Sequence, residues 1–381
     1  MILFLLFYIS IYGGVHMYAF MKLKRGLEFG IASNLLLALL MLLMLAAPIV
    51  VLALERAGQE AFARGLAYIS FIWMALIFLF ISTAFIFDIY RLIHFSARHL
   101  VQSPLEHLTL SLRSFCLLSI FLACAVVVYG YFEALNIRTD HLTITTDKLP
   151  PKIERLRIAQ ISDVHLGLIV GKSRLGRIVG KVRQARPDIL VSTGDLVDGQ
   201  MDSPEKLAEM LKSIPTRYGK YAITGNHEFY AGLERALAFT EKAGFVMLRG
   251  EGKTIEGAVN IAGVDDPARG SYRPEHATGE KAALENLPRD LYTILLKHQP
   301  VVNKASQIFF DLQLSGHTHK GQIFPFSLMT KLFYRTHTGL TTLDDNTKLY
   351  VNRGSGTWGP PIRFLALPEV TIIDIEAATG K

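Results

Sequence analysis

The sequence predicts a bundle of four transmembrane helices followed by an α/β sandwich of two sheets flanked by helices. Two observations lead to this architecture. Only 8 of the 40 Lys and Arg residues and 6 of the 33 Asp and Glu residues lie within the first 135 of the 381 residues. The rest of the chain has the charge content of a globular domain and alternates between strand-like and helix-like patterns. We therefore expect a transmembrane anchor in residues 1–135, a linker with an edge strand in 136–154 and a globular domain in 155–381.

Four stretches of the first third are long and apolar enough to cross a bilayer, which requires about 20 apolar residues. They are residues 1–21, 31–54, 66–87 and 112–132. Apart from His16, near one end of the first stretch, the four stretches contain almost no ionisable side chains. Ionisable residues usually mark a transport path through a membrane, so we expect these helices to anchor the chain.

The basic residues of the connecting loops predict the orientation of the anchor. The first and third loops together contain six basic residues, which are Lys22, Lys24, Arg25, Arg91, Arg98 and Arg113. The second loop has only Arg56 and Arg64, which Glu55 and Glu60 offset. Because basic loops stay in the cytoplasm, four spans would place the globular domain outside it.

Cysteine content and charge exclude several kinds of protein. Cys116 and Cys124 both lie in the fourth apolar stretch, so the globular domain has neither a disulfide nor a cysteine-based zinc site. The formal net charge of +7 is spread along the chain without a basic block. We therefore expect no nucleic-acid partner.

The globular domain begins with alternating strands and helices. Residues 142–146 alternate apolar and polar, as in an edge strand. Strands are then expected at 157–162, 188–193 and 220–224, and helices at 173–186, 203–214 and 233–243. Further strands are expected at 245–248, 253–256, 259–264, 292–296, 312–314, 348–352 and 370–375. Alternation followed by consecutive strands predicts a sheet-rich α/β sandwich.

Polar residues follow five of these strands directly. They are Asp163, His165, Asp195, Asn226, His298, His317 and His319. Ligands bind at the carboxyl ends of strands in α/β sheets. Oxygen and imidazole ligands without cysteine suit manganese, iron or zinc. Seven candidates suit two divalent ions that share a carboxylate, an arrangement that promotes in-line attack at phosphorus.

The order of these motifs resembles that of the calcineurin-like metallophosphoesterases. The motifs are Asp163-Val164-His165, Gly194-Asp195, Gly225-Asn226-His227-Glu228, His298 and Gly316-His317-Thr318-His319. The resemblance covers residues 155–320 and extends more weakly through 354–363. With its apolar spans, the chain is similar to the bacterial membrane-anchored branch of predicted phosphohydrolases.

The resemblance implies a role for each motif residue. One ion would bind Asp163, His165, Asp195 and His319, and the other would bind Asp195, Asn226, His298 and His317. Asp195 and a hydroxide that attacks phosphorus would bridge the two ions. His227 would stabilise charge or protonate the leaving oxygen. Glu228 either orients a neighbouring ligand or is a plain surface residue.

The substrate is expected to be a phosphodiester or pyrophosphate in a lipid-linked or envelope molecule. Residues 323–334 are strongly apolar, and they form either a core strand or lid or a surface that contacts the bilayer or an acyl chain. Arg335, Arg353 and Arg363 are candidates for holding a phosphate. Two alternatives stay open. One is a UDP-2,3-diacylglucosamine pyrophosphohydrolase of lipid A synthesis, whose substrate is made on the cytoplasmic face. The other is a non-catalytic metal-binding receptor or scaffold.

Overall fold

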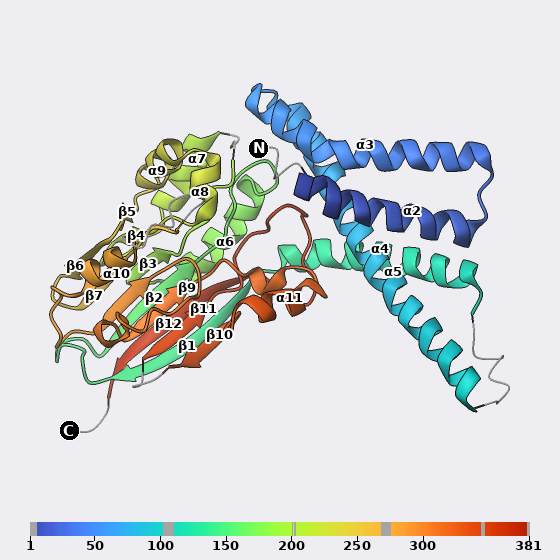
Figure 1. Ribbon diagram of the computed structural model, residues 1–381. Coiled ribbons are helices and arrows are strands. Elements are labelled where there is room, and N and C mark those ends of the chain that lie inside the picture. Colours follow the sequence, from blue (N-terminus) through green and yellow to red (C-terminus); the bar gives the residue numbers. More distant parts are fainter. Residues whose placement is uncertain are drawn as a thin grey trace. The chain divides into compact units, whose positions relative to one another are not determined.

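The computed structural model describes residues 6–101, 110–199, 201, 203–267, 276–343 and 347–378 (Figure 1). The chain divides into two compact units. The helical unit comprises Met1–Phe132 with Pro360–Ile362, and the globular unit comprises Glu133–Gly359 with Arg363–Lys381. Each unit is described by itself below.

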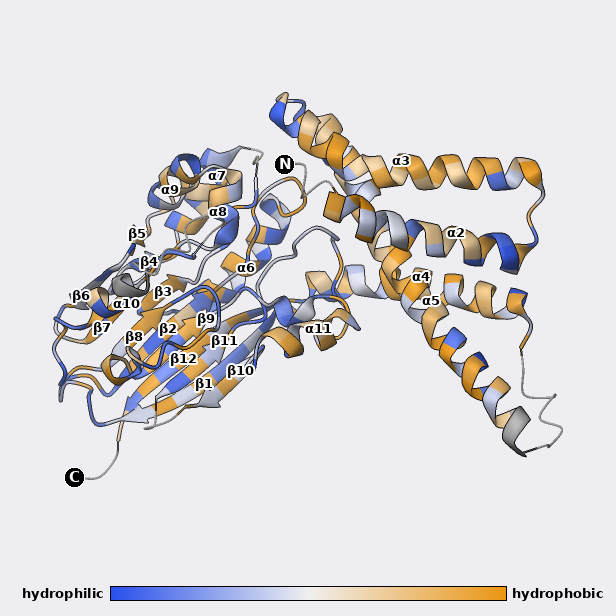
Figure 2. Cartoon of the chain, viewed as in Figure 1, coloured by the Kyte–Doolittle hydropathy of each residue, from blue (hydrophilic) through white to orange (hydrophobic). Residues whose placement is uncertain are grey.

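Three helices of the helical unit are long and apolar enough to span a membrane, judged over the described residues. They are α3 (Ile31–Arg56), α4 (Glu60–Val101) and α5 (Leu112–Leu135), and they match the second, third and fourth predicted spans. Figure 2 shows that apolar residues cover these helices. Much of this surface is exposed, as at Leu35 and Leu36, which are 67% and 70% accessible. Such exposure fits a surface that faces lipid.

The first predicted span is not among these three helices. Residues 1–5 lie outside the described part of the chain. The remainder contains a π-helical turn, η1 (Ile9–Gly13), followed by the short helix α2 (Gly14–Leu27), which continues through the charged residues Lys22 and Lys24. Arg98, one of the six basic residues used to predict the orientation, lies in a part of α4 whose side chains are not described.

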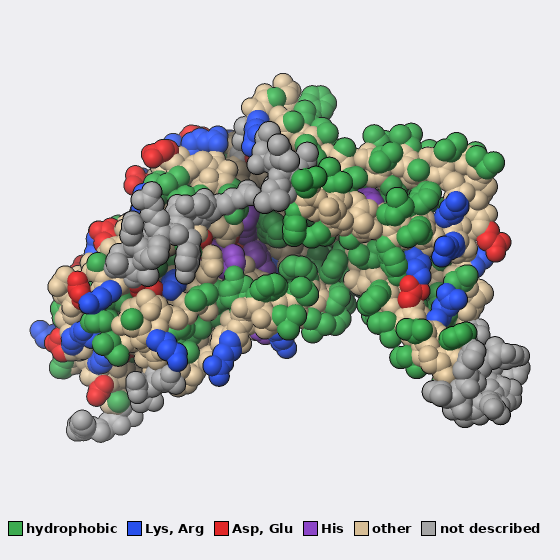
Figure 3. Space-filling model, viewed as in Figure 1, with side chains coloured by type: hydrophobic (Ala, Val, Ile, Leu, Met, Phe, Trp, Pro, Cys, Tyr) green, Lys and Arg blue, Asp and Glu red, His purple; other side chains and the backbone are tan. Residues whose placement is uncertain are grey.

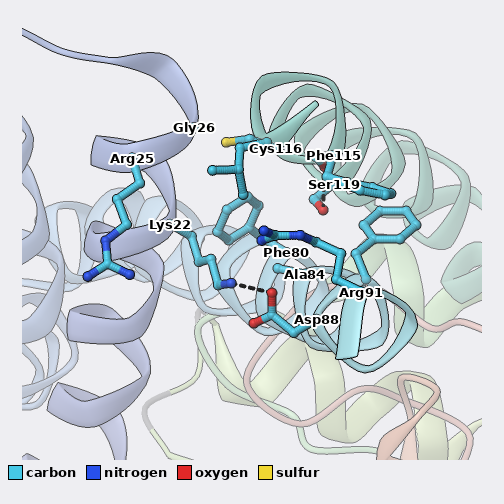
Figure 4. Close-up of a pocket in the computed structure, with 12 residues that line it drawn as sticks. Lys22, Arg25, Gly26, Phe80, Ala84, Asp88, Arg91, Phe115, Cys116 and Ser119 are labelled. Carbon is cyan, nitrogen blue, oxygen red and sulfur yellow. Dashed lines mark hydrogen bonds and ion pairs between the residues drawn. The ribbon is translucent and has the colours of Figure 1, made fainter. Parts of the chain in front are cut away.

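A cavity of about 190 Å³ with several charged residues in its lining lies between α2, α4 and α5 (Figure 4). Lys22 of α2 pairs with Asp88 of α4, and the hydroxyl of Tyr18 donates to the same carboxylate at 2.7 Å. The backbone of α2 approaches α5 closely at Gly26, where a Cβ atom would lie 2.5 Å from Cβ of Cys116. Arg25 and Arg91 also line this cavity, so the helical unit holds a cluster of charged side chains in a largely apolar bundle.

The globular unit is built on two six-stranded sheets. The first sheet has the order β1 (Arg138–Thr146), β12 (Glu369–Ala377), β2 (Arg155–Ile161), β3 (Ile189–Ser192), β4 (Lys220–Ala222) and β5 (Val246–Met247). The second sheet has the order β10 (Gly339–Thr342), β11 (Lys348–Val351), β9 (Leu312–Ser315), β8 (Thr293–Leu296), β7 (Val259–Gly263) and β6 (Glu251–Ile255). All the predicted strands are present, and β10 is an additional strand that the sequence did not predict.

The strands that precede the candidate ligands run parallel to one another within each sheet. Strands β2, β3, β4 and β5 pair in parallel, as do β7, β8, β9 and β11. The predicted edge strand is confirmed and begins earlier, at Arg138. One buried cluster contains Ile158 and Val191 from the first sheet together with Ile294 and Leu312 from the second. The sheets therefore pack face to face as a sandwich.

The helices of the globular unit are short, and several of them are amphipathic. They are α6 (Lys172–Ala185), α7 (Pro204–Lys212), α8 (Asn226–Ala231), α9 (Leu233–Lys242), α10 (His276–Leu284) and α11 (Phe326–Phe333). The predicted helices correspond to α6, α7 and α9. In α6, Leu175, Ile178, Val179 and Val182 are buried at the helical spacing that defines one apolar face. Figure 1 shows α7, α8 and α9 on one side of the unit and α11 on the other.

Candidate metal centre

The seven predicted ligands follow the carboxyl ends of five strands. Asp163 and His165 come after β2, Asp195 comes after β3, and Asn226 begins α8 after β4. In the second sheet, His298 follows β8, and His317 and His319 follow β9. Since these strands are parallel within each sheet, their loops meet at one end of the sandwich.

Three ligand atoms converge in the first half of the site. The Nε2 atoms of His165 and His319 lie 3.0 Å apart, and Oδ1 of Asp163 lies 3.3 Å from Nε2 of His319. All three side chains are buried. Two imidazole nitrogens and a carboxylate oxygen that point at one another form an arrangement typical of metal ligands.

A second group of ligand atoms lies next to the first. Nδ1 of His317 lies 3.2 Å from Nε2 of His298 and 3.2 Å from Oδ1 of Asn226. Oδ2 of Asp195 lies 3.2 Å from Nε2 of His298 and 3.8 Å from Nε2 of His165 in the first group. One carboxylate oxygen therefore faces both groups.

Backbone strain is concentrated at these ligands. Five of the seven adopt positive φ angles between 48° and 71°, which are Asp163, His165, Asp195, His317 and His319. Such a conformation costs roughly 1–3 kcal/mol for a residue other than glycine and persists where the surroundings enforce it. The strain is therefore evidence that the fold holds these side chains for a function.

Two glycines are required at the points where the motif loops approach each other. A Cβ atom at Gly225 would lie 2.2 Å from Oδ1 of Asp195. A Cβ atom at Gly316 would lie 2.2 Å from Oδ2 of Asp163. These glycines allow the loops to bring ligands from different strands into contact.

Hydrogen bonds orient several of the ligands. Nδ1 of His298 donates to the carbonyl of Thr193 at 2.7 Å, which leaves Nε2 available as a lone-pair donor. The carboxylate of Asp163 accepts the backbone N–H of His317 at 2.9 Å. The carboxylate of Asp195 accepts the backbone N–H of His227 at 2.8 Å. These contacts hold the ligands in place, and at His298 and Asp195 they use a different atom from the one that converges with the other ligands.

Glu228 is buried, so it is not the surface residue that the sequence allowed as an alternative. Its carboxylate accepts N–H groups from Asp195, Leu196 and Val197 at 2.7–3.1 Å and from Gly225 at 2.7 Å. It therefore ties the loop after β3 to the start of α8, and so fixes the backbone of two ligand motifs.

His227 lies beside the ligands and is held by a carboxylate that sequence reasoning missed. Nδ1 of His227 bonds to Oδ1 of Asp198, which also lies 3.5 Å from Nδ1 of His165. Burial by itself would lower the pKa of His227, but the bond to Asp198 and the charge of Asp195 outweigh it and raise the pKa to about 9. The spacing Gly194-Asp195-Leu196-Val197-Asp198 was the available signal, because it places a second acid in the same loop.

Electrostatics keeps two ligand histidines neutral. Burial, the largest cause, lowers the pKa of His317 to about 3. Burial, His165 and Arg363 lower the pKa of His319 well below its ordinary value. A neutral imidazole offers the lone pair that a metal needs.

The three predicted phosphate-binding arginines occupy different environments. Arg363 is completely buried, and its guanidinium donates to the carbonyls of Arg353, Gly356 and Ala366 at 2.7–2.9 Å. Arg353 pairs with Asp140 and Glu369. Arg335 is exposed. The structure thus gives Arg363 and Arg353 structural roles, because their donors are already used within the domain, and we assign neither of them to substrate.

The donor set fits divalent metal ions. Carboxylate, amide and neutral imidazole atoms converge in two adjoining groups, and Oδ2 of Asp195 faces both. The Nε2 atoms of His165 and His319, 3.0 Å apart, are close enough to bind the same cation through their lone pairs.

Comparison with known proteins agrees with this geometry. A sequence profile of the family described as calcineurin-like phosphoesterase matches residues 156–321. The chain is also 40% identical over 259 residues to an uncharacterized metallophosphoesterase of Aquifex aeolicus (strain VF5), in an alignment that covers 67% of this chain and 98% of that protein. The chain belongs to the metallophosphoesterase family.

Other metallophosphoesterases match a similar share of the chain. A protein of Danio rerio named as a transmembrane protein with a metallophosphoesterase domain is 33% identical over 273 residues, covering 68% of this chain and 62% of the relative. An uncharacterized metallophosphoesterase of Helicobacter pylori (strain ATCC 700392 / 26695) is 34% identical, covering 69% and 71%. The predicted family and fold are confirmed, and the protein is a metal-dependent phosphoester hydrolase with apolar helices of membrane-spanning length.

Proposed function

We propose that this metallophosphoesterase binds two divalent ions, of manganese, iron or zinc, and hydrolyses a phosphodiester or pyrophosphate in a lipid-linked or envelope molecule. The carboxylate of Asp195 is the observation that carries the proposal, since one of its oxygens faces both groups of ligands. His165, His319 and Asp163 would complete one site. The other site would be completed by Asn226, His298 and His317.

Ions at these two sites would neutralise phosphoryl oxygens and activate a water for attack on phosphorus. The protein supplies proton transfer and orientation. His227 is protonated at neutral pH, because its pKa is about 9, and it lies at the edge of the ligand cluster. It is therefore suited to donate a proton from Nε2 to the leaving oxygen, while Asp198 holds the opposite face of the ring.

The rim of the site supports an amphiphilic substrate. The ring of Tyr334 lies 5.6 Å from that of His317, and the ring of Trp358 lies 5.9 Å from that of His227. Arg335 directly follows Tyr334 and is exposed, so it is the predicted arginine that remains available to a phosphate. Aromatic rings beside the ligands, with a cation next to one of them in the sequence, suit a phosphate group with an apolar substituent.

Hydrolysis tests this proposal directly. The detergent-purified chain should hydrolyse bis-nitrophenyl phosphate or a lipid pyrophosphate with manganese, and Asp195→Asn should abolish the activity and lower bound metal. Asp374→Asn, far along the sheet from the ligands, is the matched control. Absence of any activity that Asp195→Asn removes would favour the receptor or scaffold alternative.

The side of the membrane on which the globular unit lies discriminates between an envelope substrate and the substrate of lipid A synthesis. We propose that the globular unit lies outside the cytoplasm, as the loop charges predict. In a chain with Cys116 and Cys124 replaced by alanine, Lys152→Cys should react with an impermeant maleimide in intact cells. Lys24→Cys should react only after permeabilisation. The reverse pattern would place the domain in the cytoplasm and favour the pyrophosphohydrolase alternative.

A further inference from the structure

Helix α11 has its apolar side facing outward. Leu328, Met329, Leu332 and Phe333 are 53%, 45%, 79% and 76% exposed. The polar side is turned inward instead: the backbone of Ser327 lies so close to Gly321 that a Cβ atom there would approach it to 2.4 Å. A surface helix of a water-soluble domain has the opposite arrangement, with apolar residues against the core.

A neighbouring loop extends the apolar surface of α11. Phe324, just before the helix, is 38% exposed, and its N–H donates to the carbonyl of Phe364 at 3.1 Å. This bond brings Leu365, which is 57% exposed, alongside the start of α11. Trp358 is 53% exposed, and its backbone N–H donates to the side-chain oxygen of Gln322 at 2.9 Å. We call Phe324, Leu328, Met329, Leu332, Phe333, Trp358 and Leu365 the apolar patch.

The apolar patch adjoins the candidate metal centre. Trp358 belongs to the patch and packs against His227, and Tyr334 follows α11 directly and packs against His317. Figure 3 shows hydrophobic side chains over α11 next to purple histidine side chains. The patch and the site therefore open on the same part of the globular unit.

The charged residues of the segment that contains α11 are all positive. No Asp or Glu occurs from residue 312 to residue 343, whereas Lys320, Lys331 and Arg335 occur within this segment. An apolar helix face bordered by cations is the composition of a helix that lies in the headgroup region of an anionic bilayer.

The chain holds the globular unit close to a membrane. Helix α5, which is long and apolar enough to span, ends at Leu135, and β1 begins at Arg138. An extended chain advances only about 3.5 Å per residue, so this connection spans roughly 10 Å. A bilayer is therefore always within reach of the globular unit.

We propose that α11 and the apolar patch insert into the headgroup region of the bilayer that the apolar helices cross. The occupant of this surface is the lipid of that bilayer, with its anionic headgroups facing Lys320, Lys331 and Arg335. Insertion places Trp358 and Tyr334 at the level of the headgroups. The candidate metal centre then faces phosphate groups at the membrane surface, a consequence that rests on the proposed function, whereas insertion itself does not.

Fluorescence quenching tests the insertion. The full chain, with Cys116 and Cys124 replaced by alanine, would carry a single nitrobenzoxadiazole label at Leu332→Cys. The matched control is Glu241→Cys on α9, an exposed position on the other side of the globular unit. Both variants would be reconstituted into vesicles of phosphatidylethanolamine and phosphatidylglycerol that contain lipids with a spin label on the acyl chain.

We expect the label at position 332 to show a blue-shifted emission and to lose about half of its intensity to the spin-labelled lipids, while the label at 241 is unaffected. Equal behaviour of the two labels would overturn the proposal. A blue shift without quenching by lipid would also overturn it, because a second copy of the chain would then cover α11. The Asp195→Asn variant should be quenched to the same extent. An unmodified chain that shows the expected quenching but hydrolyses no phosphoester would refute the proposed function alone.

Discussion

The ring of His227 is fixed by Asp198, whose carboxylate bonds to Nδ1 of the imidazole. A carboxylate accepts hydrogen bonds only, so Nδ1 carries a proton and Nε2 faces away from Asp198. The pair joins two motif loops, because Asp198 follows β3 and His227 follows β4. This arrangement gives Asp198 a positioning role in the reaction, through the orientation and protonation of His227.

The variant Asp198→Asn should lower kcat by roughly 10–100-fold, because an amide can turn its N–H₂ toward Nδ1 and favour the wrong tautomer of His227. Steady-state hydrolysis of bis-nitrophenyl phosphate would give kcat and KM, and bound metal would be measured on the same sample. KM and metal content should change little. An unchanged kcat would show that Asp198 supports only the fold.

The close approach at Gly225 predicts that a single methyl group impairs metal binding. In Gly225→Ala, the new Cβ would meet Oδ1 of Asp195 at 2.2 Å, so the carboxylate must move away from the other ligands. We expect a clear loss of tightly bound metal, measured by elemental analysis after dialysis, although every ligand is still present.

The control for Gly225→Ala is Gly180→Ala in α6. Apart from its own helix, no described atom lies within 4 Å of a Cβ at Gly180, and alanine favours a helix by up to about 1 kcal/mol over glycine. This variant should keep its metal and should not be less stable. Full metal occupancy in Gly225→Ala would mean that Asp195 does not have to lie where the structure places it.

Burial of Arg363 predicts a loss of stability rather than a loss of substrate affinity. The variant Arg363→Met would leave the carbonyls of Arg353, Gly356 and Ala366 without their donor, at a cost of about 3 kcal/mol or more. The thermal unfolding midpoint of the purified chain should therefore fall sharply. The exposed Arg335 offers the contrast, since Arg335→Met should raise KM and leave the midpoint unchanged. A raised KM with normal stability in Arg363→Met would restore its predicted contact with phosphate.

The ligand positions could be predicted from sequence because the signal is local. Asp163, Asp195 and His317 each follow a buried strand within a few residues, and the order of parallel strands brings such positions to one edge of a sheet. The glycines at 225 and 316 were visible for the same reason, since their motifs require sharp turns.

The remaining features depend on the direction of side chains, which hydropathy does not record. In the sequence, Asp198 looks like any other carboxylate in a loop, and only its contact with His227 in the folded chain sets it apart. Arg363 seemed available for phosphate until the fold surrounded it with carbonyl groups. The sequence identified residues 323–334 as apolar, but it could not tell whether Leu332 faced the core or the solvent.

An ion pair between two neighbouring strands of the first sheet makes stability depend on pH. Arg157 of β2 and Asp374 of β12 are direct cross-strand partners, joined by two hydrogen bonds of 2.7 and 2.8 Å. The bond from Arg157 lowers the pKa of Asp374 below its ordinary value of 3.8. A carboxyl with a lowered pKa in the folded state stabilises the fold above the unfolded pKa, and this contribution is lost as the pH falls through the folded pKa.

We therefore expect Asp374→Asn to lower the free energy of unfolding by about 1 kcal/mol at pH 7, and the difference from the unmodified chain to shrink below about pH 4. Denaturant unfolding in detergent between pH 7 and pH 3 would measure both effects. Glu205→Gln is the control, because the pair of Glu205 with Lys242 is exposed and should leave the unfolding midpoint unchanged. A difference for Asp374→Asn that does not shrink at all between pH 7 and pH 3 would assign the effect to packing of the side chain, since a contribution from the charge declines once the pH falls below the unfolded pKa.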